Sequence, residues 1–87
     1  MYAIIVYDVA VERINNVRGF LKQLMNWVQN SVFEGELTES EFMRVQKSLN
    51  EIIDKDEDHI IIYLMAGNKY LNKVELGTPK SEISNIL

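Results

Sequence analysis

Two short apolar runs and two amphipathic stretches divide the chain into alternating strands and helices. Residues 2–7 are apolar at almost every position and residues 59–65 nearly so, a pattern typical of strands buried in a sheet. Residues 12–25, and the segment that follows residue 38, instead repeat their apolar side chains at helical spacing. The pattern therefore predicts a strand and a helix in each half of the chain.

The two helical segments carry the same apolar stripe. The second stripe repeats the first with a constant offset of 28 residues, and the first strand shifted by that offset falls on residues 31–35. This repeat predicts two β-α-β halves, which is the α+β ferredoxin-like arrangement β-α-β-β-α-β. A chance match between two ordinary amphipathic helices is the alternative. The matching positions are Ile14, Val17, Leu21, Leu24 and Met25, then Phe42, Val45, Leu49, Ile52 and Ile53.

The remaining segments complete this outline. Residues 27–37 are expected to be extended, with a bulge or bend at Gly35. Thr38 and Glu41 have the spacing of a capping box, which predicts the start of the second helix. Residues 70–76 are expected to add an edge strand. We therefore divide the chain into a ferredoxin-like domain, residues 1–65, and an edge strand with a tail, residues 66–87, that packs on a partner subunit.

The composition narrows the class of protein. The chain has 87 residues, of which 47% are hydrophobic and none is cysteine, as in one small globular domain without disulfides or thiolate metal ligands. It has neither a leader pattern nor a long apolar span, so we expect a cytoplasmic protein. The net charge of −4 argues against a simple electrostatic nucleic-acid binder. Nine of the thirteen acids lie in residues 34–58, however, which leaves room for a basic face elsewhere.

Asp8 ends the first apolar run abruptly, and it is the first candidate for chemistry. A buried strand seldom tolerates a charge, so Asp8 must lie where the strand leaves the core. One interpretation is a loop residue that caps the next helix or a turn. The other is a ligand of a divalent cation, since Mg²⁺ is held by one or two carboxylates while it keeps several waters. The sequence offers no convincing second metal ligand to join Asp8 within one chain. Glu36 is not expected to be that ligand, because in an antiparallel sheet it would lie at the opposite edge.

The first helix carries the candidate nucleic-acid contacts. Arg18 and Lys22 share one flank of this helix, where Gly19 would let a nucleic-acid backbone approach closely. A solvated helix face is the alternative. Arg13 points toward the end of the first strand, where it could pair with Asp8 or with a bound phosphate.

Other side chains give weaker signals. By strand alternation Ser31 and Phe33 face the same side, and a nucleophilic serine would need His59, the single histidine, as its base. No triad spacing supports that, so His59 is interpreted as an ordinary strand-end residue. The aromatic rings of Trp27, Tyr7 and Phe33 could stack on bases, although core packing is the commoner use.

Three segments together resemble a known family. They are IIVYD at residues 4–8, ERINNVRGFL at residues 12–21 and WVQNSVFEGELTESEF at residues 27–42. In order and spacing, residues 1–65 resemble the small CRISPR-associated proteins that are second in the Cas numbering and partner the Cas integrase. The resemblance implies a ferredoxin-like homodimer whose final strand packs on the partner subunit.

The resemblance also implies a site. Asp8 matches an aspartate that faces its mate across the two-fold axis, and Ser31 and Phe33 match a serine and a phenylalanine of the second-strand region. The family's basic residues match in kind, without a full arginine cluster, at Arg13, Arg18 and Lys22.

Two functions follow from the resemblance. The first is a Mg²⁺- or Mn²⁺-dependent endoribonuclease or endonuclease, in which the two Asp8 carboxylates hold the ion and Arg13 or Lys22 steadies the phosphate. The second is an antiviral adaptor that bridges two integrase dimers on spacer DNA, with residues 83–87 as a docking surface. A small-ligand sensor is a further alternative that fits the acidic charge but has no supporting motif.

Overall fold

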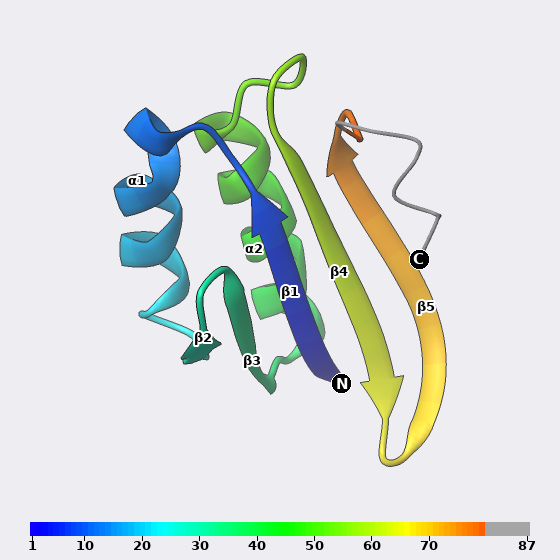
Figure 1. The fold of residues 1–87 in the computed structure, drawn as a ribbon. Coiled ribbons are helices and arrows are strands. Elements are labelled where there is room, and N and C mark those ends of the chain that lie inside the picture. Colours follow the sequence, from blue (N-terminus) through cyan, green and yellow to red (C-terminus); the bar gives the residue numbers. More distant parts are fainter. Residues whose placement is uncertain (80–87) are drawn as a thin grey trace.

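An antiparallel sheet with two helices on one face makes up residues 1–79, the part of the chain that the computed structural model describes (Figure 1). The sheet order is β2-β3-β1-β4-β5, so the first strand of the chain lies at the centre. The strands are β1 Tyr2–Asp8, β2 Asn26–Gln29, β3 Val32–Glu36, β4 His59–Ala66 and β5 Lys69–Gly77; the helices are α1 Val11–Leu21 and α2 Glu39–Ile52.

This topology confirms the predicted ferredoxin-like fold. The elements follow the order β-α-β-β-α-β, with β1 hydrogen-bonded to β3 on one side and to β4 on the other. β5 is the predicted edge strand, and it pairs with β4 of the same chain. Packing of residues 66–87 on a partner subunit stays a prediction, and residues 80–87, with the proposed docking tail, lie outside the described residues.

The two faces of β1 differ in burial. Ala3, Ile5 and Tyr7 are buried against the helices, whereas Ile4 is half-buried and Val6 is 36% exposed on the opposite face. This opposite face, on which neither α1 nor α2 packs, is called the helix-free face below. Within residues 1–79, helices therefore cover only one side of the apolar run that the sequence presents as a wholly buried strand.

Both predicted helical stripes pack into the core. Val17, Leu21, Val45 and Leu49 are fully buried, and the other stripe positions are buried or packed against them. α1 ends earlier than expected, at Leu21 rather than near Met25, and the chain continues in a turn that still buries Met25. No helix within residues 1–79 is both long and apolar enough to cross a membrane.

The predicted capping box starts α2. The Thr38 hydroxyl accepts a hydrogen bond from the Glu41 amide at 3.1 Å, and the Glu41 carboxylate accepts one from the Thr38 amide at 2.9 Å. Two amide groups at the helix N-terminus are thereby satisfied. The helix consequently begins at residue 39, as predicted.

The segment expected to be one extended stretch, residues 27–37, is a hairpin instead. A turn at Asn30 and Ser31 separates β2 from β3, and Asn30 has a positive φ of 39°, which asparagine tolerates better than most residues. The irregular pairing lies between Trp27 and Gln29 rather than at Gly35, so the predicted position of the bulge is wrong. Gly35 pairs in regular register with Ala3.

Candidate nucleic-acid and metal site

Asp8 lies at the carboxyl end of β1, with its side chain exposed on the helix-free face. Its direct cross-strand neighbour on β4 is His59, and His59 in turn contacts Glu75 on β5 through Nε2 and Oε1, 2.8 Å apart. The hydrogen bond from His59 lowers the pKa of Glu75. Asp8, His59 and Glu75 thus form a polar row across three strands at one end of the helix-free face.

A single chain supplies one carboxylate at the end of β1 rather than a complete metal site. No group of three or more histidine, aspartate or glutamate side chains in residues 1–79 is placed to hold a metal ion. Glu36 pairs in register with Tyr2, at the opposite end of β1 from Asp8, and its carboxylate lies 2.9 Å from the amino terminus of Met1. The prediction that Asp8 and Glu36 are not partners within one chain is therefore confirmed.

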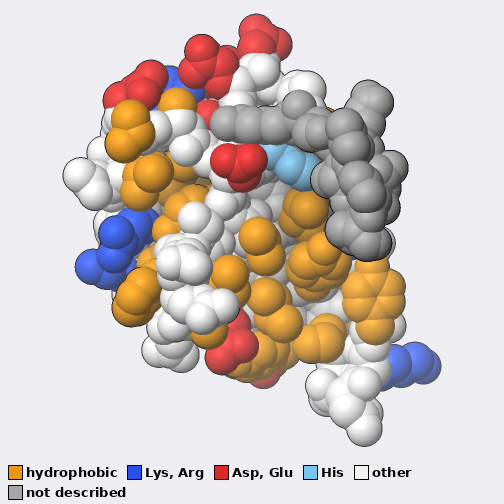
Figure 2. All heavy atoms as spheres, in the orientation of Figure 1, with side chains coloured by type: hydrophobic (Ala, Val, Ile, Leu, Met, Phe, Trp, Pro, Cys, Tyr) orange, Lys and Arg blue, Asp and Glu red, His pale blue; other side chains and the backbone are white. Residues whose placement is uncertain are grey.

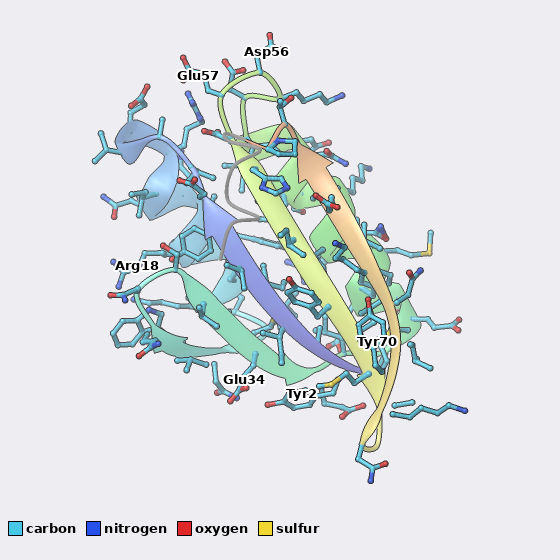
Figure 3. All side chains as sticks on the ribbon, turned by 45° about the vertical axis from the view of Figure 1, so that its right-hand side comes forward. Tyr2, Arg18, Glu34, Asp56, Glu57 and Tyr70 are labelled. Atoms are coloured by element: carbon cyan, nitrogen blue, oxygen red, sulfur yellow. The ribbon has the colours of Figure 1, made fainter. Side chains whose placement is uncertain are left out.

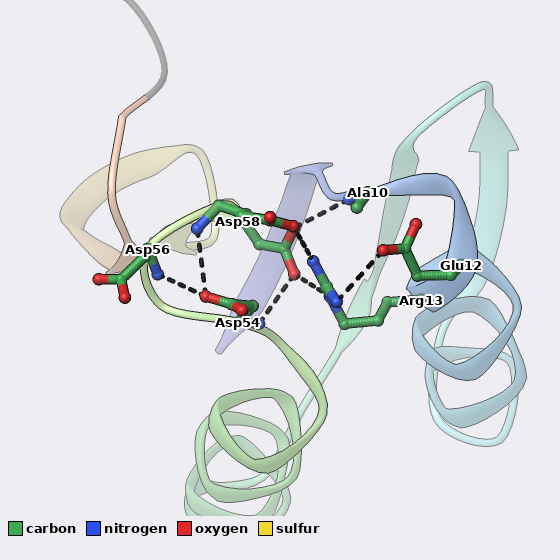
Figure 4. Close-up of polar contacts among 7 residues, drawn as sticks. Ala10, Glu12, Arg13, Asp54, Asp56 and Asp58 are labelled. Carbon is green, nitrogen blue, oxygen red and sulfur yellow. Dashed lines mark hydrogen bonds and ion pairs between the residues drawn. The ribbon is translucent and has the colours of Figure 1, made fainter.

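Arg13 makes close polar contacts with carboxylates of its own chain (Figure 4). Its Nε lies 2.6 Å from Oδ2 of Asp58, and its Nη2 lies 2.8 Å from a carboxylate oxygen of Glu57. These carboxylates raise the pKa of Arg13 further above its ordinary value. The guanidinium is engaged by Asp58 and Glu57, so the phosphate contact predicted for Arg13 would have to compete with them.

Asp58 is a structural residue that the sequence does not reveal. Its side chain is fully buried and accepts backbone hydrogen bonds from Ala10 at 2.8 Å and Asp54 at 2.9 Å, besides those from Arg13. Burial alone would raise the pKa of Asp58, but these hydrogen bonds outweigh it and lower the pKa to about 2. We call Arg13, Ala10, Asp54 and Asp58 the Asp58 clamp.

The clamp fixes the surroundings of Asp8. It fastens Ala10, two residues beyond Asp8, to the loop that leads into β4, and His59 at the start of β4 pairs with Asp8. A buried carboxylate such as that of Asp58 is stable only when hydrogen-bond donors surround it. The donors to Asp58 come from three separate segments of the chain. The orientation of the backbone around Asp8 therefore depends on the clamp.

Arg18 and Trp27 form a second cluster beside the hairpin turn. The Arg18 guanidinium carbon lies 5.7 Å from the centroid of the Trp27 ring, and the indole Nε1 donates to the Asn30 carbonyl at 3.0 Å. Lys22, the residue at the C-cap of α1, is exposed one turn beyond Arg18. No aspartate or glutamate of residues 1–79 lies within ion-pair distance of Arg18.

The other aromatic and serine candidates are placed differently. Phe33 is fully buried and Tyr7 nearly so, with ring centroids 6.2 Å apart, so both belong to the core. Ser31 lies in the hairpin turn, where its carbonyl accepts a hydrogen bond from the Tyr7 amide at 3.0 Å. That contact brings the turn beside the end of β1, one residue from Asp8.

Comparison with known proteins decides the family. Residues 1–73 match the family described as CRISPR associated protein Cas2. The chain belongs to the Cas2 family. A Methanosarcina acetivorans protein named CRISPR-associated endoribonuclease Cas2 is 58% identical over 87 residues, which is the whole of both chains. A Methanothermobacter thermautotrophicus protein of the same name is 48% identical over all of this chain and 96% of its own length.

Solved Cas2 structures also match this chain. One, described as the crystal structure of Cas2, has a TM-score of 0.74 and 43% identity, and covers 93% of this chain and 91% of its own. Streptococcus pyogenes Cas2 at pH 6.5 has a TM-score of 0.72 and 35% identity, and covers 78% of this chain and 89% of its own. The resemblance drawn from the three sequence segments is confirmed, and the Cas2 match extends past β4 into β5.

Proposed function

We propose that this Cas2-family chain is an endoribonuclease that hydrolyses phosphodiesters with Mg²⁺ or Mn²⁺ and acts as a homodimer. The observation that carries the proposal is the position of Asp8: an exposed carboxylate at the end of the central strand, on a face that carries no helix. The name endoribonuclease, borne by relatives such as the Methanosarcina protein, supports the choice of reaction.

The helix-free face supports the dimer (Figure 2). Hydrophobic side chains gather over the strands on the face seen in this view, where water would otherwise meet them. Monomeric proteins seldom leave a continuous apolar sheet face uncovered, and a second copy related by a two-fold axis would cover it. The apolar side chains on this face are Ile4, Val6, Val32, Ile61, Tyr63 and Met65.

Asp8 is chemically suited to a hard divalent ion. Mg²⁺ accepts one or two carboxylates and keeps several waters, so one Asp8 from each subunit would be enough. When bound, such an ion supplies an activated water and neutralises charge on the phosphodiester oxygens. The chain's own contribution is to present the carboxylate at a fixed strand end, held there by the pairing with His59 and by the Asp58 clamp.

Cationic residues of α1 would position the substrate. Arg18 and Lys22 lie one turn apart, and neither is within ion-pair distance of a carboxylate in residues 1–79. Charges of this kind bind phosphates and keep a nucleic acid in register without reading its sequence. Arg13, in contrast, is proposed to act on the site through Asp58 rather than by binding phosphate.

The test is the Asp8→Ala variant of the purified chain, assayed on a labelled single-stranded RNA with Mg²⁺ and with EDTA. We expect cleavage to fall to background in both the variant and the EDTA sample, while circular dichroism and gel filtration remain unchanged. Glu36→Ala is the matched control, because it removes an exposed carboxylate from the opposite end of the same strand pair. Cleavage by Asp8→Ala at the wild-type rate would overturn the proposal.

A non-catalytic adaptor is the second candidate, favoured by the same cationic flank. In this role the dimer would bridge two integrase dimers on spacer DNA, with Arg18 and Lys22 following the duplex backbone. Charge reversal, Arg18→Glu with Lys22→Glu, should weaken duplex binding and flatten its dependence on salt. Asp8→Ala should then leave spacer integration intact. If this charge reversal leaves duplex binding unchanged, the Arg18 and Lys22 flank of α1 is not the surface that binds the DNA backbone.

A further inference from the structure

Trp27 is exposed where the other large aromatic side chains nearby are buried. It is the single tryptophan of the chain, it lies on the edge strand β2, and it is 51% exposed, whereas Tyr7 and Phe33 are at most 3% exposed. The core therefore does not account for the position of the indole. An exposed tryptophan with fixed surroundings is a candidate binding group.

The indole ring is held in place from two sides. Its Nε1 donates to the Asn30 carbonyl, which fixes the ring relative to the hairpin turn, and the Arg18 guanidinium lies 5.7 Å from its centroid. Figure 3 shows Arg18 beside that turn. Because these contacts exist in the chain by itself, little side-chain entropy is left to lose when a flat partner stacks on the ring.

No carboxylate among the described residues neutralises the charge of Arg18. Its Nε is buried without a hydrogen-bond acceptor in residues 1–79, and no carboxylate of those residues is within ion-pair distance. Among the described residues, the contact with the Trp27 ring, rather than an ion pair, therefore holds the guanidinium group. A planar apolar surface combined with an available cation fits a nucleotide, which has a flat base and a negative phosphate.

We propose that Trp27 and Arg18 form a subsite for an unpaired nucleobase, with the base stacked on Trp27 and its phosphate near Arg18. The inference rests on the proposed function and specifies its substrate as a strand with unstacked bases. The hairpin turn contacts both the proposed subsite and the end of β1. The Asn30 carbonyl accepts a hydrogen bond from the Trp27 indole, and the Ser31 carbonyl accepts one from the amide of Tyr7, the residue before Asp8. A strand that extends from the subsite to Asp8 would have to pass this turn.

A fluorescence titration tests the subsite directly, because all tryptophan emission comes from Trp27. The Asp8→Ala chain, which we expect to leave the oligonucleotide uncut, is titrated with an unstructured RNA, with an abasic oligonucleotide of equal length and with a blunt duplex. We expect strong quenching by the unstructured RNA and little by the other two. Equal quenching by the abasic strand would overturn the proposal, since phosphates alone would then explain binding.

Variants test the same point without relying on tryptophan emission. By anisotropy of a labelled RNA, Trp27→Ala and Trp27→Leu should bind about 5- to 140-fold more weakly, the usual range for losing one stacked base, while Trp27→Phe keeps most of the affinity. Leucine preserves apolar bulk without an aromatic face, so a purely structural role would spare it. Tyr70→Ala, which removes another aromatic side chain that is 58% exposed, is the matched control and should bind like wild type.

The outcomes separate this inference from the proposed function. If Asp8→Ala cuts RNA as wild type does but Trp27→Leu still loses binding, the proposed catalysis fails and the subsite stands. If Asp8→Ala abolishes cleavage and Trp27→Leu binds RNA normally, the subsite fails alone. A Trp27→Leu variant that binds RNA normally but changes elution on gel filtration would assign the indole to a contact between protein chains, which also overturns the subsite.

Discussion

Replacing Asp58 by asparagine removes the negative charge at the centre of the Asp58 clamp while keeping the shape of the side chain. The buried carboxylate accepts hydrogen bonds from Ala10, Asp54 and the Arg13 guanidinium. Asparagine retains one acceptor oxygen and turns an amide donor toward groups that are themselves donors. The folded protein should therefore lose stability at neutral pH.

The size of this loss follows from the pKa. The carboxyl pKa falls from 3.8 to about 2 on folding, and at about 1.4 kcal/mol per tenfold change this corresponds to about 2 kcal/mol of folding free energy. Because the folded pKa is the lower one, this stability is fully present above about pH 4 and is lost as the pH falls through 2. By the same linkage relation, about half of it is already gone at pH 3.

The assay is urea unfolding followed by circular dichroism at pH 7 and pH 3, with one protein concentration throughout so that association is held constant. Asp58→Asn should be less stable than wild type by at least about 2 kcal/mol at pH 7, and the difference should shrink by about 1 kcal/mol at pH 3. Asp56→Asn, in the same loop but exposed, is the control and should match wild type at both pH values. A difference that is absent at pH 7, or equal at the two pH values, would refute the role given to the buried charge.

Three further substitutions test local features of the fold. Thr38→Ala removes the capping hydroxyl and should cost about 1 kcal/mol in urea unfolding, whereas Thr38→Ser should cost little. Gly77→Ala introduces a Cβ that collides with the Asp58 carbonyl at a positive φ of 81°, and should lower the melting temperature with a loss of at least about 1–2 kcal/mol. Gly19→Ala, in contrast, meets no atom within 4 Å and should raise helix stability by up to about 1 kcal/mol. If the nucleic-acid backbone approaches α1 at Gly19, the same change should weaken duplex binding.

The parts of the fold that could be predicted from sequence are those set by local periodicity. The apolar run of β1, the stripes of α1 and α2 and the capping box at Thr38 each depend on neighbours within a few residues, so the pattern alone located these elements, although not the partly exposed second face of β1. The hairpin was missed for a local reason as well. Asn30 and Ser31 lie between polar and β-branched residues that continue the alternating pattern, and the turn conformation of Asn30 leaves little trace in composition.

The candidate site likewise contains residues that the sequence reveals and residues that only the tertiary structure reveals. Asp8 could be located from sequence because it ends an apolar run, but Asp58 could not, because it stands in an acidic loop that looks solvated. Its burial depends on donors from α1, from the loop after β1 and from the end of α2, which only the tertiary fold brings together. The exposure of Trp27 is equally non-local, since it depends on the edge position of β2 in the sheet.

The central place of β1 has a consequence for how the protein is made. The first strand to leave the ribosome pairs on one side with residues 32–36, from the middle of the chain, and on the other with residues 59–65, which emerge much later. Until β4 has emerged, the nascent chain carries an apolar strand with at least one unpaired edge, which is prone to bind other chains. Folding of the sheet must therefore wait until most of the chain has been synthesised, and its long-range pairings should make this step slow for so small a protein.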